Sequence, residues 1–262
     1  MNPIYSVEGN IGSGKSTFID ILMKEKYFKN VVYLKEPVHI WETIKDKENE
    51  TILEKFYKNQ EKYSFSFQIM AYISRLSELK RVIKENPKKI ILTERSILTD
   101  KNVFAKMLYD DKKIEEINYK IYLKWFDDFM SDFNFCGIIY IQTNPEICNQ
   151  RIKKRNRKGE ENIPMKYSVK CHIYHEDWIN NIEIINKNNY KKLYLDGNVN
   201  FKENIPIEWY EKMNKLFMKD KWDLSQEQKN NLSKNKYFDH YISFNNCDEK
   251  LVQKDGFSNS FV

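Results

Sequence analysis

The chain has 262 residues, of which 41% are hydrophobic and 15% aromatic, so it can bury a sizeable core and is not a disordered protein. Its 44 basic and 38 acidic side chains give a net charge of +6, and this mixture excludes a strongly basic protein of the histone kind. Six of the basic residues are arginine and the rest are lysine. The positive charge therefore predicts a lysine-coated surface and no nucleic-acid partner.

The four cysteines show no metal-ligand spacing, and we expect reduced thiols at Cys136, Cys148, Cys171 and Cys247. No apolar run approaches the length of a membrane span. Residues 3–8 lead directly into a glycine-rich loop, without the layout of a signal peptide. These features predict a cytoplasmic protein with no membrane partner.

Short apolar runs alternate with longer amphipathic segments along the chain. The expected elements are a strand (3–8), a helix from residue 17, a strand (31–34), a helical segment (50–85), a strand (89–93), a helix (112–131), a strand (137–141), helices (145–155 and 164–187) and a strand (193–195). This alternation predicts an α/β domain over residues 1–220, with a parallel sheet covered on both faces. The polar residues 221–262 show no fixed period, and we expect a mobile or loosely docked extension.

Residues 9–16 match the phosphate-loop pattern GxxxxGK[ST] and lie between an expected strand and an expected helix, as the motif requires. Glycines allow backbone N–H groups to turn toward phosphates, Lys15 brings a cation to the β- and γ-phosphates, and the Ser16 hydroxyl can bind Mg²⁺. We therefore expect the phosphates of ATP to contact Gly9, Asn10, Ile11, Gly12, Ser13, Gly14, Lys15, Ser16 and Thr17. The guanine signature NKxD and a DxxG switch are absent, which argues against a GTPase.

Two carboxylates follow expected strands, where the active sites of parallel sheets lie. Glu36 is a candidate base for a sugar hydroxyl, and Glu94 is expected to hold magnesium together with Ser16. Arg95 can orient Glu36 and contact the transferring phosphoryl group.

Arg151, Arg155 and Arg157 fall within seven residues of a chain that prefers lysine. Planar guanidinium groups bind phosphate oxygens in a bidentate manner and neutralise charge on a transferring phosphoryl group. We expect these arginines to bind phosphate oxygens, with Arg155 in a catalytic role.

Further motifs resemble those of the deoxynucleoside kinase family and cover about residues 3–215. The first two are Glu36-Pro37-Val38-His39-Ile40-Trp41 and the pair Phe67-Gln68 with Tyr57 and Arg75. Next come Glu94-Arg95-Ser96 with Asp100 and Phe104, and the arginines Arg151, Arg155 and Arg157 with Glu160. The last are Tyr167 with His175-Glu176-x-Trp178, and Asp196-Gly197-Asn198-Val199-Asn200-Phe201. Each motif is weak alone except the phosphate loop, but their order and spacing together are specific.

The resemblance implies a P-loop kinase fold with strand order 2-3-1-4-5. It also implies an arginine-rich lid, which contains Arg151, Arg155 and Arg157. It implies ATP and Mg²⁺, a deoxynucleoside as acceptor, and a homodimer that pairs through the helices at 62–85 and 112–131. It further implies an adenine-binding loop with Asp196, Asn198 and Phe201, and substrate contacts from Trp41, Tyr57, Phe67, Gln68, Phe104 and Glu160. His39 and His175 are expected to be structural. The chain departs from the family pattern at Gly159, where an acid is usual, and at Lys101, where an arginine is usual.

The resemblance also bears on the base that is accepted. Arg75 and Asp100 fall at positions that flank the exocyclic group of the base and are similar to the deoxycytidine and deoxyguanosine kinase branch. Asp100 can only accept hydrogen bonds, which suits an amino group and not the carbonyl oxygen of thymine. Ala71 leaves room for a purine. We expect deoxycytidine or a purine deoxynucleoside to be preferred over thymidine.

Two other functions fit the phosphate loop. A nucleoside monophosphate kinase of the thymidylate type is disfavoured, because Glu36 and Glu160 would repel an acceptor phosphate. A nucleic-acid-binding protein that uses ATP as a switch is suggested by the net charge alone. Transfer of label from ATP to a free nucleoside would separate these alternatives.

Overall fold

The computed structural model describes residues 1–160, 163–185 and 190–217. The chain divides into two compact units, Met1–Ile205 and Pro206–Val262, and the second unit contains helix α10 (Ile207–Phe217). The extension expected at 221–262 lies outside the described residues. The division of the chain at residue 220 therefore stays a prediction.

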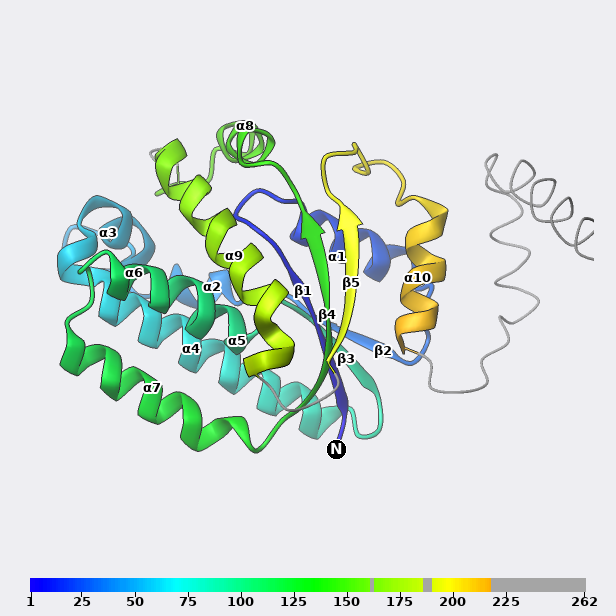
Figure 1. Cartoon of the computed structure of the whole chain (residues 1–262). Coiled ribbons are helices and arrows are strands. Elements are labelled where there is room, and N and C mark those ends of the chain that lie inside the picture. Colours follow the sequence, from blue (N-terminus) through cyan, green and yellow to red (C-terminus); the bar gives the residue numbers. More distant parts are fainter. Residues whose placement is uncertain (161–162, 186–189, 218–262) are drawn as a thin grey trace, which may run out of the picture. The chain divides into compact units, whose positions relative to one another are not determined.

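A five-stranded parallel sheet forms the centre of the first unit (Figure 1). Its strands are β1 (Pro3–Glu8), β2 (Val31–Leu34), β3 (Ile90–Glu94), β4 (Asn134–Gln142) and β5 (Lys191–Asp196). They lie in the order β2-β3-β1-β4-β5, and every neighbouring pair is parallel. Both the α/β class and the predicted strand order are confirmed.

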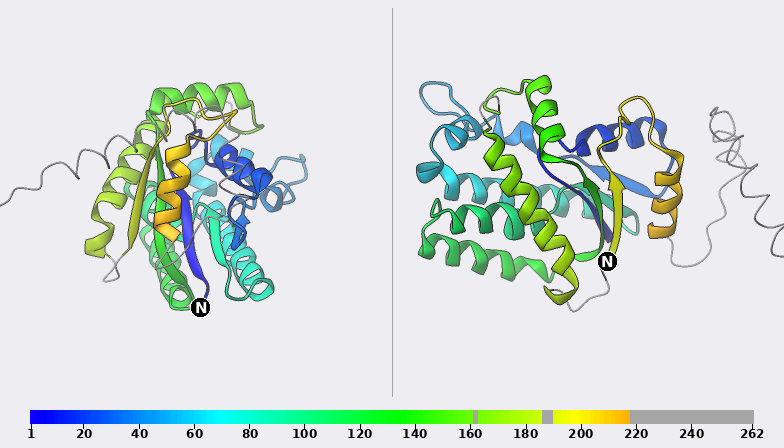
Figure 2. Two further views of the ribbon diagram at one scale, coloured as in Figure 1. Left: turned by 90° about the vertical axis from the view of Figure 1, so that its right-hand side faces the viewer. Right: turned by 45° about the horizontal axis from the view of Figure 1, so that its top comes forward.

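Helices connect the strands and cover both faces of the sheet (Figures 1 and 2). They are α1 (Lys15–Glu25), α2 (Val38–Trp41), α3 (Ile52–Lys58), α4 (Gln60–Glu85), α5 (Ile97–Thr99), the π-helix η1 (Asp100–Ala105), α6 (Lys106–Asp110), α7 (Glu116–Met130), α8 (Pro145–Arg155) and α9 (Met165–Ile185). Helices α4, α7 and α9 lie on one face, and α1 lies on the other. Among the described residues, no helix combines the length and the apolar character needed to cross a membrane.

Alternate residues of the strands build the main core. Ile4, Ile91 and Ile138 are at most 1% exposed and pack in one cluster with Tyr72 of α4 and Trp178 of α9. Burial of large apolar side chains on this scale stabilises the fold by about 1.5–3 kcal/mol for each side chain. The sheet is therefore a rigid base for groups at its edges.

Two helical segments differ from the sequence-based expectation. The segment expected as one helix over 50–85 is two helices, because Asn59 leaves the helical conformation (φ −147°, ψ 85°) and its side chain caps α4 by accepting from Lys62 N. Thr51 and Glu54 form a capping box that starts α3. The π-helix η1 was not predicted. Such turns are frequent at functional sites.

The register of the sheet assembles one edge from distant residues. Val7 of β1 pairs with Glu94 of β3, and the N–H of Arg95 donates to Val7 O at 2.9 Å. The phosphate loop after β1 and the Glu94-Arg95-Ser96 segment after β3 therefore meet at the carboxyl edge. This is the edge where open α/β sheets bind ligands.

Candidate active site

The loop between β1 and α1 closes around the Lys15 side chain, which is buried. Its Nζ donates to the backbone oxygens of Asn10 (2.6 Å) and Gly9 (3.1 Å). Gly14 has a φ of +105°, and a Cβ there would lie 2.6 Å from the Phe201 ring, so this position requires glycine. Burial lowers the pKa of Lys15 to about 7. Anionic oxygens at this loop would favour its charged form.

Glu94, at the end of β3, lies against the beginning of α1. Ser16 Oγ donates to Glu94 Oε1, and the N–H of Glu36 donates to Glu94 Oε2 at 3.3 Å. The described residues contain no cluster of three or more His, Cys, Asp or Glu that could hold a metal alone. Mg²⁺, however, commonly binds through one or two carboxylates together with the phosphates of its substrate. The hydroxyl and carboxylate oxygens of Ser16 and Glu94 fit that mode.

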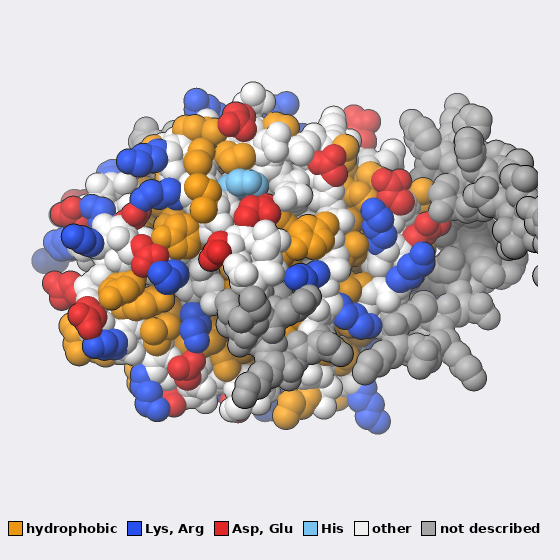
Figure 3. All heavy atoms as spheres, viewed as in Figure 1, with side chains coloured by type: hydrophobic (Ala, Val, Ile, Leu, Met, Phe, Trp, Pro, Cys, Tyr) orange, Lys and Arg blue, Asp and Glu red, His pale blue; other side chains and the backbone are white. Residues whose placement is uncertain are grey.

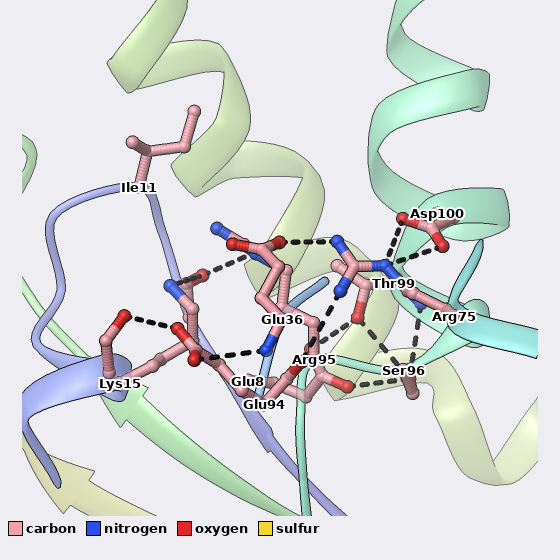
Figure 4. Close-up of polar contacts among 12 residues, drawn as sticks. Glu8, Ile11, Lys15, Glu36, Arg75, Glu94, Arg95, Ser96, Thr99 and Asp100 are labelled. Atoms are coloured by element: carbon pink, nitrogen blue, oxygen red, sulfur yellow. Dashed lines mark hydrogen bonds and ion pairs between the residues drawn. The ribbon is translucent and has the colours of Figure 1, made fainter. Parts of the chain in front are cut away.

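Glu36 follows β2 and lies between two guanidinium groups (Figure 4). Arg75 Nη2 donates to Glu36 Oε1, and Arg95 Nε lies 3.4 Å from the same oxygen. Burial alone would raise the pKa of Glu36, but the two guanidinium groups outweigh it and lower the pKa to about 2. Glu36 is therefore a carboxylate at neutral pH. The expectation that Arg95 lies where it can orient Glu36 agrees with this geometry.

Arg75 also binds Asp100, the first residue of η1. Arg75 Nε lies 3.0 and 3.2 Å from the two carboxylate oxygens, and its guanidinium carbon lies 5.3 Å from the centre of the Trp41 ring. Burial raises the pKa of Asp100 to about 6, although Arg75 opposes this effect. The predicted Arg75–Asp100 pair is thus present and buried. It connects Glu36 to the far end of the site.

Aromatic side chains form one wall of a cavity of about 670 Å³. Phe67 stacks on Phe56 with ring centroids 4.7 Å apart, and Trp41 meets Phe67 edge-on at 5.4 Å. Within the described part of the chain, Oε1 of the buried Gln68 has no hydrogen-bond partner, and Gln68 itself lines the cavity. All of the predicted substrate residues line this cavity: Glu36, Trp41, Tyr57, Phe67, Gln68, Arg75, Arg95, Asp100, Phe104 and Glu160.

One of the three lid arginines binds backbone oxygens, and the other two share a carboxylate. Arg151 donates to the backbone oxygens of Ser13 (3.2 Å) and Gly197 (2.9 Å), and so joins the phosphate loop to the loop after β5. Arg155 Nη2 and Arg157 Nη1 both bind the Glu160 carboxylate, the latter at 3.1 Å. All three arginines line the cavity. To contact a phosphate, Arg155 and Arg157 would have to break their ion pairs with Glu160.

The two departures from the family pattern have structural explanations. Gly159 adopts φ +88°, and a Cβ there would lie 3.1 Å from Glu54 Cγ, so an acidic residue would be strained. Next to it, Lys158 forms an ion pair with Glu54 at 2.9 Å. Lys101 points to the surface and pairs with Asp127 at 2.9 Å.

The loop after β5 contains three residues that were predicted to bind ATP, and only one of them lines the cavity. Phe201 lines the cavity, but Asp196 and Asn198 do not. Asp196 Oδ1 accepts from the Asn198 backbone N–H (2.9 Å) and side chain (2.8 Å), and Asn198 Oδ1 accepts from Asn144 N. These two side chains shape the loop. Gly9, Asn10 and Ser13 likewise lie outside the cavity lining, whereas the other predicted donor-binding residues line it.

Comparison with known proteins agrees with this geometry. A model of the family described as deoxynucleoside kinase matches residues 5–219. The chain belongs to the deoxynucleoside kinase family. Deoxycytidine kinase 1 of Xenopus laevis is 34% identical over 223 residues, which are 76% of this chain and 83% of that protein.

Two further relatives show how broad the likeness is. A probable deoxycytidine kinase of fowlpox virus is 37% identical over 177 residues (66% of this chain and 70% of that protein). The mitochondrial deoxyguanosine kinase of Xenopus laevis is 28% identical over 221 residues (76% and 83%). This deoxynucleoside kinase thus resembles both enzymes that act on a pyrimidine and enzymes that act on a purine.

The structure of this kinase also reveals residues that the sequence did not single out. Glu8, the last residue of β1, is fully buried and accepts from Ser96 Oγ (2.7 Å) and Thr99 Oγ1, so it clamps the turn after β3 (Figure 4). Its position directly before the phosphate loop is the sequence feature that could have indicated this role. Further lining residues are Leu53, Phe56 and Lys202, whose sequence context is ordinary.

Proposed function

We propose that this deoxynucleoside kinase transfers the γ-phosphoryl group of ATP to the 5′-hydroxyl of a deoxynucleoside. The observation that carries the proposal is a single cavity lined both by Lys15 of the phosphate loop and by the buried Arg75–Asp100 pair, with Glu36 between them (Figure 4). A phosphate donor and a base-bearing acceptor can therefore meet at one carboxylate. Such a cavity would bring the two reactants together, as attack geometry requires.

Glu36 acts as the proton acceptor in this proposal. The 5′-oxygen forms a bond to the γ-phosphorus, its proton passes to Glu36, and the bond from phosphorus to the bridging oxygen of ADP breaks. A pKa of about 2 makes Glu36 a weak base. Phosphoryl transfer proceeds through a loose transition state, so orientation of the hydroxyl matters more than base strength. Arg95 keeps the carboxylate in place.

Positive groups surround the transferring phosphoryl group. Lys15 contacts the β- and γ-phosphates, and Arg155 and Arg157 leave Glu160 to neutralise the equatorial oxygens. Glu160 is then free to accept from the 3′-hydroxyl together with Tyr57. Burial, and after it the nearby Glu160, raise the pKa of Tyr57 well above its usual value, which keeps its hydroxyl protonated.

Ser16 and Glu94 would hold Mg²⁺ beside these phosphates. When bound, the ion neutralises charge on the β- and γ-phosphoryl oxygens. The adenine of ATP would lie between Arg151 and Phe201, in the loop that Asp196 and Asn198 shape.

The Arg75–Asp100 pair supports a preference for deoxycytidine or a purine deoxynucleoside over thymidine. With Arg75 Nε on its two oxygens, the Asp100 carboxylate can accept from an amino group of the base. Thymine would bring a second acceptor there, and an unmet buried polar contact costs about 1–3 kcal/mol, or roughly 10- to 100-fold in specificity. The Gln68 side-chain amide lines the cavity and would pair with the base edge.

Product analysis with γ-labelled ATP tests the proposed reaction. Label in deoxycytidine 5′-monophosphate, formed from deoxycytidine, is the expected result. Label that appears only in a nucleoside diphosphate, with a monophosphate as acceptor, would instead indicate a monophosphate kinase. Release of labelled inorganic phosphate stimulated by DNA or RNA would indicate a nucleotide switch. Basic and acidic side chains are interspersed on the face shown in Figure 3, which does not favour nucleic-acid binding there.

We further propose a homodimer formed through α4 and α7. These helices are joined by the hydrogen bond from Tyr72 OH to Trp125 O. Ile117, Ile121 and Trp125 recur every four residues along α7 and are 62%, 41% and 53% exposed, and Ile73 of α4 is 52% exposed. Large exposed apolar side chains that gather on neighbouring helices are typical of protein–protein interfaces.

A further inference from the structure

His175 of α9 is fully buried and touches a residue of the proposed catalytic machinery. Its Nδ1 lies 2.6 Å from the Cys171 carbonyl oxygen, and its Nε2 lies 3.4 Å from Arg95 Nη1. A carbonyl oxygen only accepts and a guanidinium only donates. The two partners therefore require the tautomer that carries its proton on Nδ1 and a lone pair on Nε2.

The surroundings of His175 also require an uncharged ring. Burial, and then the positive charge of Arg95, lower its pKa well below the usual value. The hydrogen bond to the Cys171 carbonyl opposes this effect, and Lys15 and His172 add to it. A proton on Nε2 would place two donors face to face. The imidazole is thus a permanent acceptor for Arg95 near neutral pH.

Arg95 has an unusual backbone conformation, and several contacts hold its side chain. It has a φ of +61°, in the left-handed region that non-glycine residues seldom adopt. Its Nη1 donates to Gly9 O at 2.9 Å as well as to His175, and its guanidinium carbon lies 4.9 Å from the centre of the Phe104 ring. The Nε edge of the guanidinium is directed at Glu36, whose Oε1 lies 3.4 Å from Nε.

We propose that His175 is a positioning residue, which accepts from Arg95 through Nε2 and so holds the guanidinium where it orients Glu36. The inference rests on the proposed function, because it assigns His175 to the support of that reaction. The competing explanation is that the ring only fills space, since it lies parallel to Tyr140 (13°, centroids 6.3 Å apart) and edge-on to Phe104 (87°, 6.1 Å).

Two substitutions separate these explanations. His175→Phe keeps an aromatic ring between Tyr140 and Phe104 but removes the acceptor. His175→Gln removes the ring but keeps an acceptor oxygen near the position of Nε2. His172→Gln, one turn earlier on the same helix, is the matched control, because His172 is not part of the site.

We expect His175→Phe to lower kcat roughly 10-fold or more, as loss of a positioning contact does, with the KM for deoxycytidine nearly unchanged. His175→Gln should retain more of the wild-type kcat than the Phe variant, and His172→Gln should match the wild type. Full kcat in His175→Phe, or a greater loss in His175→Gln than in His175→Phe, would show that only packing matters and overturn the proposal.

Nitrogen-15 NMR of histidine-labelled wild-type enzyme provides a test that does not depend on the variants folding. The expected spectrum has a proton on Nδ1 of His175 and none on Nε2. A proton on Nε2 would overturn the proposal. An active wild-type enzyme with that result contradicts only the role of His175, whereas a wild-type enzyme that phosphorylates no deoxynucleoside contradicts the proposed function and this inference with it.

Discussion

At the scale of single residues, the distribution of arginine separates functional charge from surface charge. The chain contains six arginines among 44 basic residues. Five of them line the cavity: Arg75, Arg95, Arg151, Arg155 and Arg157. The sixth, Arg81, pairs with Glu78 and Glu85 on the surface. The planar fork of arginine binds carboxylates and phosphates in a bidentate manner, which lysine cannot do, so a lysine-rich chain places its arginines where that geometry is needed.

The first residue-scale prediction concerns Glu36. We expect Glu36→Gln to slow the chemical step roughly 100-fold or more, because the amide cannot accept the proton. ATP affinity, measured by calorimetry, should be nearly unchanged. Glu42→Gln, at an exposed position just after α2, is the control and should behave as the wild type. Wild-type turnover in Glu36→Gln would remove Glu36 from the role of base.

The second prediction follows from the raised pKa of Asp100, which is about 6. Above this pH the carboxylate only accepts, and below it the protonated carboxyl group can also donate to a carbonyl oxygen of thymine. The ratio of kcat/KM for deoxycytidine to that for thymidine should therefore fall as the pH drops from 8 to 5. In Asp100→Asn the ratio should not vary with pH in this way. A wild-type ratio that stays constant over this range would contradict the assignment.

At the scale of elements, the proposed mechanism requires the lid arginines to change partners. Arg155 binds Glu160 in the structure, although its proposed partner is the transferring phosphoryl group. We expect Arg155→Ala to lower kcat by at least roughly 10-fold, because one charge that stabilises the transition state is lost. The KM for the nucleoside should change little. Lys153→Ala, an exposed position on the same helix, is the control, and an equal loss of kcat in both variants would count against a specific role for Arg155.

Elements were predictable where a local pattern decides them. The phosphate loop, the strand before Pro37 and the helix that ends before Asn86-Pro87 all lie where the sequence indicated. The break at Asn59 was missed, because an asparagine within an amphipathic run can continue a helix or cap one. The start of η1 was missed because the turn before it is clamped by Glu8, a residue 88 positions away from Ser96 along the chain.

The candidate site was predictable to a similar degree. The predicted substrate residues line one cavity, and the Arg75–Asp100 pair is formed as expected. The side chains of Asp196 and Asn198 lie outside that cavity, since they are used to shape their own loop. Whether a polar side chain faces a ligand or its own backbone depends on loop geometry, which spacing alone does not determine.

At the scale of the whole molecule, the proposed dimer has a direct test. We expect sedimentation equilibrium at micromolar concentration to give about twice the chain mass of 31.8 kDa. Trp125→Glu should shift the equilibrium toward the monomer, because it places a charge in an apolar interface. Lys120→Glu, on the same helix and exposed, is the control. A wild-type mass near 32 kDa would contradict the dimer.

The choice of base tests the central claim most directly, since it requires a deoxynucleoside kinase and the Arg75–Asp100 pair to act together. The measurement is kcat/KM for the four deoxynucleosides with ATP, in the wild type and in the double variant Arg75→Met with Asp100→Ala. We predict that deoxycytidine or a purine deoxynucleoside is the best wild-type substrate, with thymidine roughly 10- to 100-fold poorer, and that the double variant shifts preference toward thymidine. The account is contradicted if the wild-type enzyme phosphorylates thymidine with the highest kcat/KM.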